Sequence, residues 1–307
     1  MILTKKFIKK YIDAIKNDYR YFYDDIDEYG NVNSDTAFYF IEGINGVPGQ
    51  IRFALPSIFK KFGKNIYIKC CYLKEFSCKE LIWDKYTIKN IDKKRDKIAS
   101  DLNKMAKKYK EIKIVVSSNG FYDFLYAYPK LNKKTLTKSQ LFWVAVAPDN
   151  FKPTKWQNFF YKLNGFKKDN FTWFAFPNTK FFEFLNPEFK TEHKWAYKGM
   201  KKKFYKNDLE LRFKCFGVRW CYASIECFSS FLSHILKNSK YPIDIESYIL
   251  VATNDGYWQG KSIKEINKHI DKYILNKKII YKKASHLWVL MPENITELLN
   301  LIEEPKK

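Results

Sequence analysis

The order in which helix-like and strand-like patterns follow one another constrains the fold of this chain most strongly. Apolar residues recur at helical spacing over residues 5–19, 90–110, 261–276 and 293–302. Short apolar runs typical of strands lie among them, without a strict alternation of strand and helix. Strict alternation predicts a parallel α/β sheet, so the pattern favours an α+β fold with mixed, mostly antiparallel sheets and packed helices.

One strand pattern supports the antiparallel interpretation in particular. Residues 208–215 alternate between the apolar Leu209, Leu211 and Phe213 and intervening charged residues. Such alternation is typical of an antiparallel strand with one buried face. Less regular apolar runs predict further strands at 37–44, 51–55, 66–73, 112–116, 141–147, 171–176 and 248–252, with one strand or a hairpin at 279–291.

A polar, lysine-rich stretch near the middle of the chain is the best candidate for a linker. It covers residues 131–140 and lies between two regions that each contain helix and strand patterns. Hydrophobic residues make up 46% of the 307 residues, which is enough for sizeable cores. We therefore expect two α+β domains, at 1–130 and 141–307.

The chain is strongly basic and rich in aromatic residues. It has 56 Lys and Arg against 33 Asp and Glu, a formal charge of +23, and 19% aromatic residues. A protein this basic repels itself and is typical of one with a polyanionic partner. Lysine dominates, which favours contacts with phosphates over base edges, and the rings offer stacking surfaces. An AT-rich coding bias is the alternative explanation for the lysine excess.

The densest basic segment is the candidate nucleic-acid interface. It contains Lys194, Trp195, Lys198, Lys201, Lys202, Lys203 and Lys206. Arranged as a helix, residues 194–206 place the lysines on a face suited to phosphates. The alternative is an amphipathic surface helix whose charges are simply solvated.

A second candidate lies in the loop at 254–262. Its end, Gly260-Lys261-Ser262, approaches the phosphate-binding pattern G-x-x-x-x-G-K-[ST]. Asp255 stands where the first glycine belongs, and Tyr257 and Trp258 are bulky for a loop that wraps phosphates. We expect weak phosphate binding by Gly260, Lys261 and Ser262, without nucleoside triphosphate hydrolysis.

No catalytic residue is predicted. The four histidines have no Cys or acid at a suggestive spacing, so a Ser-His-Asp or Cys-His site cannot be assembled from local sequence. The six cysteines form no C-x-x-C pair, which argues against zinc and favours free thiols in a reducing cytoplasm. We therefore expect neither a metal nor a cofactor. A dense acidic cluster at 24–28 keeps a metal-dependent nuclease as an alternative.

These features favour a non-catalytic nucleic-acid-binding protein that contacts phosphate backbones, although enzymatic activity stays open. Aromatic-rich, motif-poor chains also include phage or mobile-element factors that bind and block a host protein complex, which is the second hypothesis. No stretch reaches about 18 uncharged apolar residues, and lysines interrupt the apolar pattern at the start of the chain. We expect a cytoplasmic protein with no membrane partner.

Overall fold

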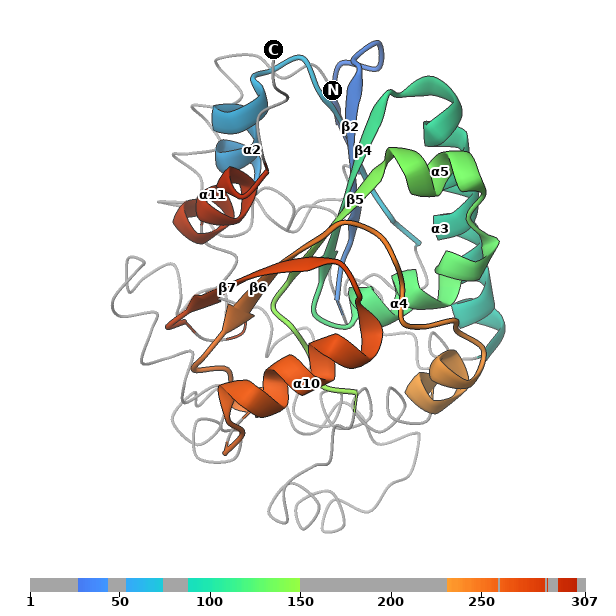
Figure 1. Cartoon of the computed structure of the whole chain (residues 1–307). Coiled ribbons are helices and arrows are strands. Elements are labelled where there is room, and N and C mark those ends of the chain that lie inside the picture. Colours follow the sequence, from blue (N-terminus) through green and yellow to red (C-terminus); the bar gives the residue numbers. More distant parts are fainter. Residues whose placement is uncertain are drawn as a thin grey trace, which may run out of the picture.

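A single twisted sheet with helices on both faces organises this computed structural model (Figure 1). The structure describes residues 27–43, 54–73, 88–149, 231–258, 260–284, 286 and 292–302. The strands are β1 (Glu28–Gly30), β2 (Thr36–Ile41), β3 (Tyr67–Cys70), β4 (Glu111–Ser117), β5 (Ser139–Val144), β6 (Ser247–Ala252) and β7 (Lys277–Lys282). Their order across the sheet is β1-β3-β2-β4-β5-β6-β7.

The described strand pairs are parallel except at one edge. β3, β2, β4, β5, β6 and β7 run parallel in succession, and only β1 pairs antiparallel, with β3. All six residues of β6 are buried, because helices cover both faces. The expected α+β fold with mixed, mostly antiparallel sheets in two domains is therefore wrong. Near-continuous apolar runs such as Tyr248–Ala252 are typical of buried parallel strands.

The lysine-rich stretch at 131–140 forms regular structure. Helix α5 (Lys133–Lys138) begins after Asn132, whose side chain accepts a hydrogen bond from the Thr135 N–H, and β5 follows directly. Strands from both sides of this stretch belong to the same sheet. The alternating segment 208–215 lies outside the described residues.

Two helical layers enclose the sheet (Figure 1). α3 (Ile88–Lys108), α4 (Gly120–Ala127) and α10 (Ile263–Tyr273) pack on one face, and α2 (Leu55–Phe62) and α11 (Pro292–Asn300) on the other. Two short 3₁₀ turns complete the described helical elements: η5 (Tyr128–Lys130) directly after α4, and η7 (Gly256–Trp258) between β6 and α10. The helices predicted at 90–110, 261–276 and 293–302 are thus confirmed, with ends shifted by a few residues.

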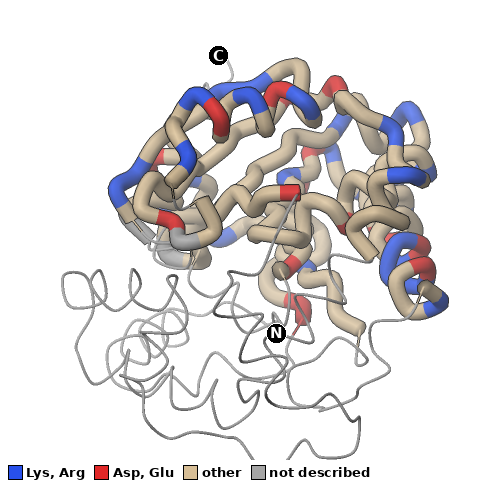
Figure 2. Tube along the Cα trace, turned by 90° about the horizontal axis from the view of Figure 1, so that it is seen from below, with Lys and Arg blue, Asp and Glu red and all other residues tan. Residues whose placement is uncertain are grey.

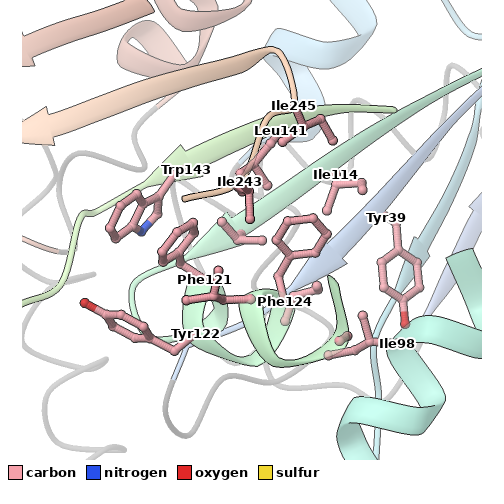
Figure 3. Packing of buried hydrophobic residues seen from close by; sticks show 14 of the residues in the cluster. Tyr39, Ile98, Ile114, Phe121, Tyr122, Phe124, Leu141, Trp143, Ile243 and Ile245 are labelled. Atoms are coloured by element: carbon pink, nitrogen blue, oxygen red, sulfur yellow. The ribbon is translucent and has the colours of Figure 1, made fainter. Parts of the chain in front are cut away.

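Many of the aromatic residues are core residues. Phe121 of α4 stacks on Trp143 of β5 with ring centroids 3.8 Å apart, and Figure 3 shows both beside Tyr122 and Phe124. The largest fully buried side chains in the described ranges are Trp143, Tyr29, Tyr39, Tyr122, Tyr248, Tyr273, Phe38, Phe121 and Phe124. Burial of rings this large is a major stabilising contribution. Aromatic content here reflects packing.

Two of the three isoleucines of α3, Ile98 and Ile88, allow this packing to be tested within one helix. Ile98 is fully buried, whereas Ile88 is 51% exposed. We expect Ile98→Ala to lower the free energy of unfolding by about 2–5 kcal/mol, because it removes buried methyl groups and leaves a cavity. Ile88→Ala should cost less than about 0.5 kcal/mol. Urea denaturation followed by circular dichroism measures both, and equal losses would contradict the described burial.

Candidate active site

The turn between β4 and α4 has an unusual backbone conformation. Ser118 adopts a left-handed conformation with φ 52°, and α4 begins two residues later at Gly120. The Ser118 N–H donates to the Val144 carbonyl of β5 over 2.9 Å. A non-glycine residue in this conformation is strained, and such strain is concentrated at functional sites.

Two glycines let the end of β2 pack against this turn. A Cβ atom on Gly120 would lie 2.3 Å from the Ile41 carbonyl oxygen, closer than any real contact. A Cβ on Gly43 would lie 2.9 Å from the Ser118 Cβ. The chain after β2 therefore passes directly beside Ser118, and both positions require glycine.

A histidine and an aspartate complete a hydrogen-bonded chain with Ser118. His286, which follows β7, places its Nε2 2.8 Å from the Ser118 Oγ. Its Nδ1 is hydrogen-bonded to Oδ2 of Asp255, which follows β6. Because β4, β6 and β7 are all oriented the same way, their carboxyl ends meet at one edge of the sheet. Residues 118, 255 and 286 form a Ser-His-Asp triad at this edge.

The acid and the base of the triad are held in place by burial and by a second hydrogen bond. Asp255 is 4% exposed and His286 3% exposed. Oδ1 of Asp255 accepts from the Tyr257 N–H over 2.8 Å, and the Tyr257 ring meets His286 edge-on with centroids 4.7 Å apart. An oriented, buried carboxylate fixes the histidine tautomer and stabilises the imidazolium that forms during proton transfer.

Glu42 lies between β2 and Gly43, next to the nucleophilic serine. Desolvation raises the pKa of this carboxyl to about 8, against a smaller opposing effect of Lys94. Lys94 of α3 is itself paired with Asp123 of α4 over 2.5 Å. Glu42 therefore keeps its proton to a higher pH than an exposed glutamate does.

The phosphate-site candidates have structural roles in this structure. The Ser262 side chain caps α10 in a capping box with Glu265, and Lys261 forms an ion pair with Glu265 over 3.0 Å. Gly260 has a positive φ of 77°. The interface candidates at 194–206, from Lys194 to Lys206, lie outside the described residues.

Local sequence reasoning missed all three triad residues, although one signal was present. Val116-Ser117-Ser118-Asn119-Gly120 fits the nucleophile-elbow pattern G-x-S-x-G except that Val116 replaces the first glycine. It follows an apolar strand and precedes an apolar helix, which is the context the pattern requires. Asp255, read as a defect in a phosphate loop, is the acid of the triad.

Solved structures of other proteins resemble this chain in fold. No family model and no curated protein matches its sequence. A metagenome-derived lipolytic enzyme has 10% identity and a TM-score of 0.50 over 90% of this chain and 96% of its own. A serine hydrolase from Cycloclasticus zankles has 15% identity and a TM-score of 0.54, over 89% of this chain and 92% of its own. A laboratory-evolved variant of a potato epoxide hydrolase has 12% identity and a TM-score of 0.50, over 89% of this chain and 93% of its own. The chain has the α/β-hydrolase fold.

The expectation of a non-catalytic nucleic-acid-binding protein, or of a phage-type blocking factor, is therefore wrong. The neighbouring structures are hydrolases, and a serine triad occupies the carboxyl edge of the sheet. Figure 2 shows Lys and Arg spread around the described trace with Asp and Glu among them. In the described ranges no cluster of three or more His, Cys, Asp or Glu could hold a metal ion.

Two other expectations concern cysteines and membranes. Cys70 and Cys71 are buried free thiols, which agrees with the sequence interpretation for these two positions. Among the helices of the described segments, none is both long and apolar enough to cross a bilayer.

The raised pKa of Glu42 predicts a pH dependence of stability. The unfolded chain loses this proton near the ordinary value of 4.5, whereas the folded chain keeps it up to about pH 8. Between those values Glu42 lowers the free energy of unfolding as pH rises, by at most about 1.4 kcal/mol per pH unit. Glu42→Gln removes this loss, so its Tm advantage over the wild type should grow from pH 5 to 8 and then level off.

Thermal unfolding in buffers from pH 5 to 9 measures this difference. Asp244→Asn, at an exposed position before β6, controls for the general effect of removing one negative charge. A Tm difference between Glu42→Gln and wild type that stays constant with pH would contradict the burial of this carboxyl.

Proposed function

We propose that this protein is a serine hydrolase that cleaves carboxylic esters through an acyl-enzyme intermediate. The observation that carries the proposal is the hydrogen-bonded chain from Ser118 Oγ through His286 to Asp255. A serine hydroxyl is a weak nucleophile unless a base accepts its proton, and His286 is within 2.8 Å of it. The order Ser, Asp, His along the chain is the order found in α/β-hydrolase triads.

Acylation follows from this geometry. His286 Nε2 takes the proton of Ser118 as Oγ attacks the carbonyl carbon, and the carbonyl π electrons move onto its oxygen. Asp255 holds Nδ1–H and stabilises the imidazolium. The tetrahedral intermediate collapses when His286 returns the proton to the leaving alcohol, which leaves an acyl group on Ser118. Water, activated by His286 in the same way, then releases the acid and regenerates Ser118.

The negative charge of the intermediate needs hydrogen-bond donors. In this fold they are the N–H of the residue after the nucleophile, here Asn119, and an N–H of the loop after the strand that corresponds to β2. Asn119 precedes α4, whose amino end carries a partial positive charge. The chain at Glu42–Gly43 passes close to Ser118, where the second donor belongs.

Ester cleavage is favoured over the other reactions of this fold by the nucleophile. An activated serine alkoxide attacks acyl carbon and yields an ester intermediate that a water molecule can hydrolyse. One structural neighbour is described as lipolytic and another as a serine hydrolase. These descriptions agree with the chemistry of Ser118, and short p-nitrophenyl esters are suitable first substrates.

Ser118→Ala tests the proposal directly. We expect it to lower kcat for p-nitrophenyl butyrate by at least about 10⁴-fold, because the nucleophile of the triad is lost. It should also abolish labelling by a fluorophosphonate probe, with the adduct on the wild type located at residue 118 by peptide mass spectrometry. Asp255→Asn should lower kcat by roughly 10⁴-fold, since the tautomer of His286 is no longer fixed.

The neighbouring serine provides a matched control. Ser117→Ala should keep both the hydrolysis rate and the labelling, because the hydrogen bond to His286 is made by Ser118. A wild type that reacts with neither the probe nor a panel of acyl esters would contradict the proposal. So would a Ser118→Ala variant with undiminished hydrolysis.

A further inference from the structure

A second histidine, His269 of α10, lies in a buried polar network that the triad chemistry does not use. Its side chain is 8% exposed, with Nε2 3.1 Å from the Tyr122 hydroxyl and Nδ1 3.5 Å from Oδ1 of Asp149. Tyr122 is in the first turn of α4, and Asp149 is on the chain that leaves β5. His269 thus joins α10 to two other parts of the fold.

The hydrogen bonds of Tyr122 have a defined direction. Its hydroxyl donates its single proton to the Ala147 carbonyl over 2.8 Å. The hydroxyl oxygen must therefore accept from the Nε2–H of His269. Tyr122 is fully buried and lies four residues after Ser118, so this pair of bonds fixes the first turn of the helix that carries the nucleophile. Figure 3 shows Tyr122 and Phe121 projecting from α4, with Trp143 of β5 close to the Phe121 ring.

Asp149 anchors the other side of the imidazole ring. It accepts from the Tyr273 hydroxyl over 2.5 Å and from the Lys272 ammonium over 2.6 Å. Burial opposes the ionisation of Asp149, but the neighbouring His269 ring and hydrogen bonds from Lys272 and Tyr273 outweigh it and hold its pKa below the ordinary value. The network therefore contains a fixed carboxylate, which orients the ring of His269.

The loop that carries the triad acid contacts the same ring. Trp258 follows Asp255 by three residues, and its Nε1–H donates to the Val146 carbonyl over 2.7 Å. The Trp258 ring meets His269 edge-on with centroids 5.1 Å apart. His269 therefore contacts both Tyr122, on the helix that follows the nucleophile, and Trp258, on the loop that carries the acid.

The triad depends on the relative position of these two supports. Ser118 and Asp255 follow β4 and β6, which are separated by β5, and His286 must reach both at once. The carbonyls at 146 and 147, just beyond β5, bind the acid loop and α4 respectively. We propose that His269 is a positioning residue for catalysis, which sets the separation of Ser118 and Asp255 through Tyr122 and Trp258.

The inference rests on the proposed serine chemistry and predicts a specific kinetic defect. A displacement of about 1 Å in a catalytic group can cost on the order of 100-fold in rate. We expect His269→Leu to lower kcat and the rate of fluorophosphonate labelling of Ser118 by roughly 10- to 100-fold, with KM changed by less than about threefold. Tyr122→Phe should show the same defect, because it removes the hydroxyl that links the ring to α4.

A conservative variant distinguishes positioning from packing. His269→Gln places an amide N–H close to the position of Nε2–H, so it should restore most of the labelling rate lost in His269→Leu. His234 offers a matched control, since its Nε2 lies 3.1 Å from the hydroxyl of Tyr126 near the far end of the same helix. His234→Leu should keep kcat and the labelling rate, even where its Tm falls as much as that of His269→Leu.

The outcomes separate this inference from the proposed function. A wild type that is not labelled at Ser118 overturns both. A labelled wild type with undiminished kcat and labelling in His269→Leu and Tyr122→Phe overturns the positioning role alone. Equal kinetic losses in His234→Leu and His269→Leu also overturn it, because they would reflect general weakening of α4. If His269→Leu does not fold, the comparison of Tyr122→Phe and His269→Gln with the wild type decides the question.

Discussion

Close packing at the turn after β4 is the constraint on which the candidate active site depends. Ser118 has a left-handed backbone, and its N–H is bonded to Val144 of β5. The turn also approaches Ile41 of β2 so closely that residue 120 must lack a side chain. Strain in the backbone persists only where the surroundings over-determine it. Here neighbouring strands on both sides of β4 hold the turn, so the sheet itself positions the nucleophile.

Electrostatics around the site follow from what is buried and how it is paired. Asp255 is buried but hydrogen-bonded to His286, the residue that becomes positively charged when it takes the serine proton. Desolvation of Glu42 outweighs the effect of the Lys94 cation, so the pKa of this carboxyl is raised.

The sequence predicts where most of the described strands and helices lie, but not how they assemble. The apolar runs at 112–116, 141–147 and 248–252 all become strands, and α3, α10 and α11 overlap the helices expected from periodicity. The prediction of antiparallel pairing rests on the strict alternation at 208–215, whereas the continuous apolar run at 248–252 is typical of a parallel strand buried on both faces. Parallel pairing is a long-range property that no single strand encodes except through such continuous apolar runs.

The triad escaped prediction for a related reason. Its members are separated by 137 residues (118 to 255) and 31 residues (255 to 286), so only folding brings them together. Val116 also removes the first glycine of the local motif that would have marked Ser118.

The same separation makes the order of synthesis matter. The nucleophile is made well before its base, since His286 follows Ser118 by 168 positions along the chain. A nascent or truncated product that ends before residue 286 carries the serine without a proton acceptor. In a growing polypeptide the serine therefore lacks its general base until the residues that follow β7 have been added.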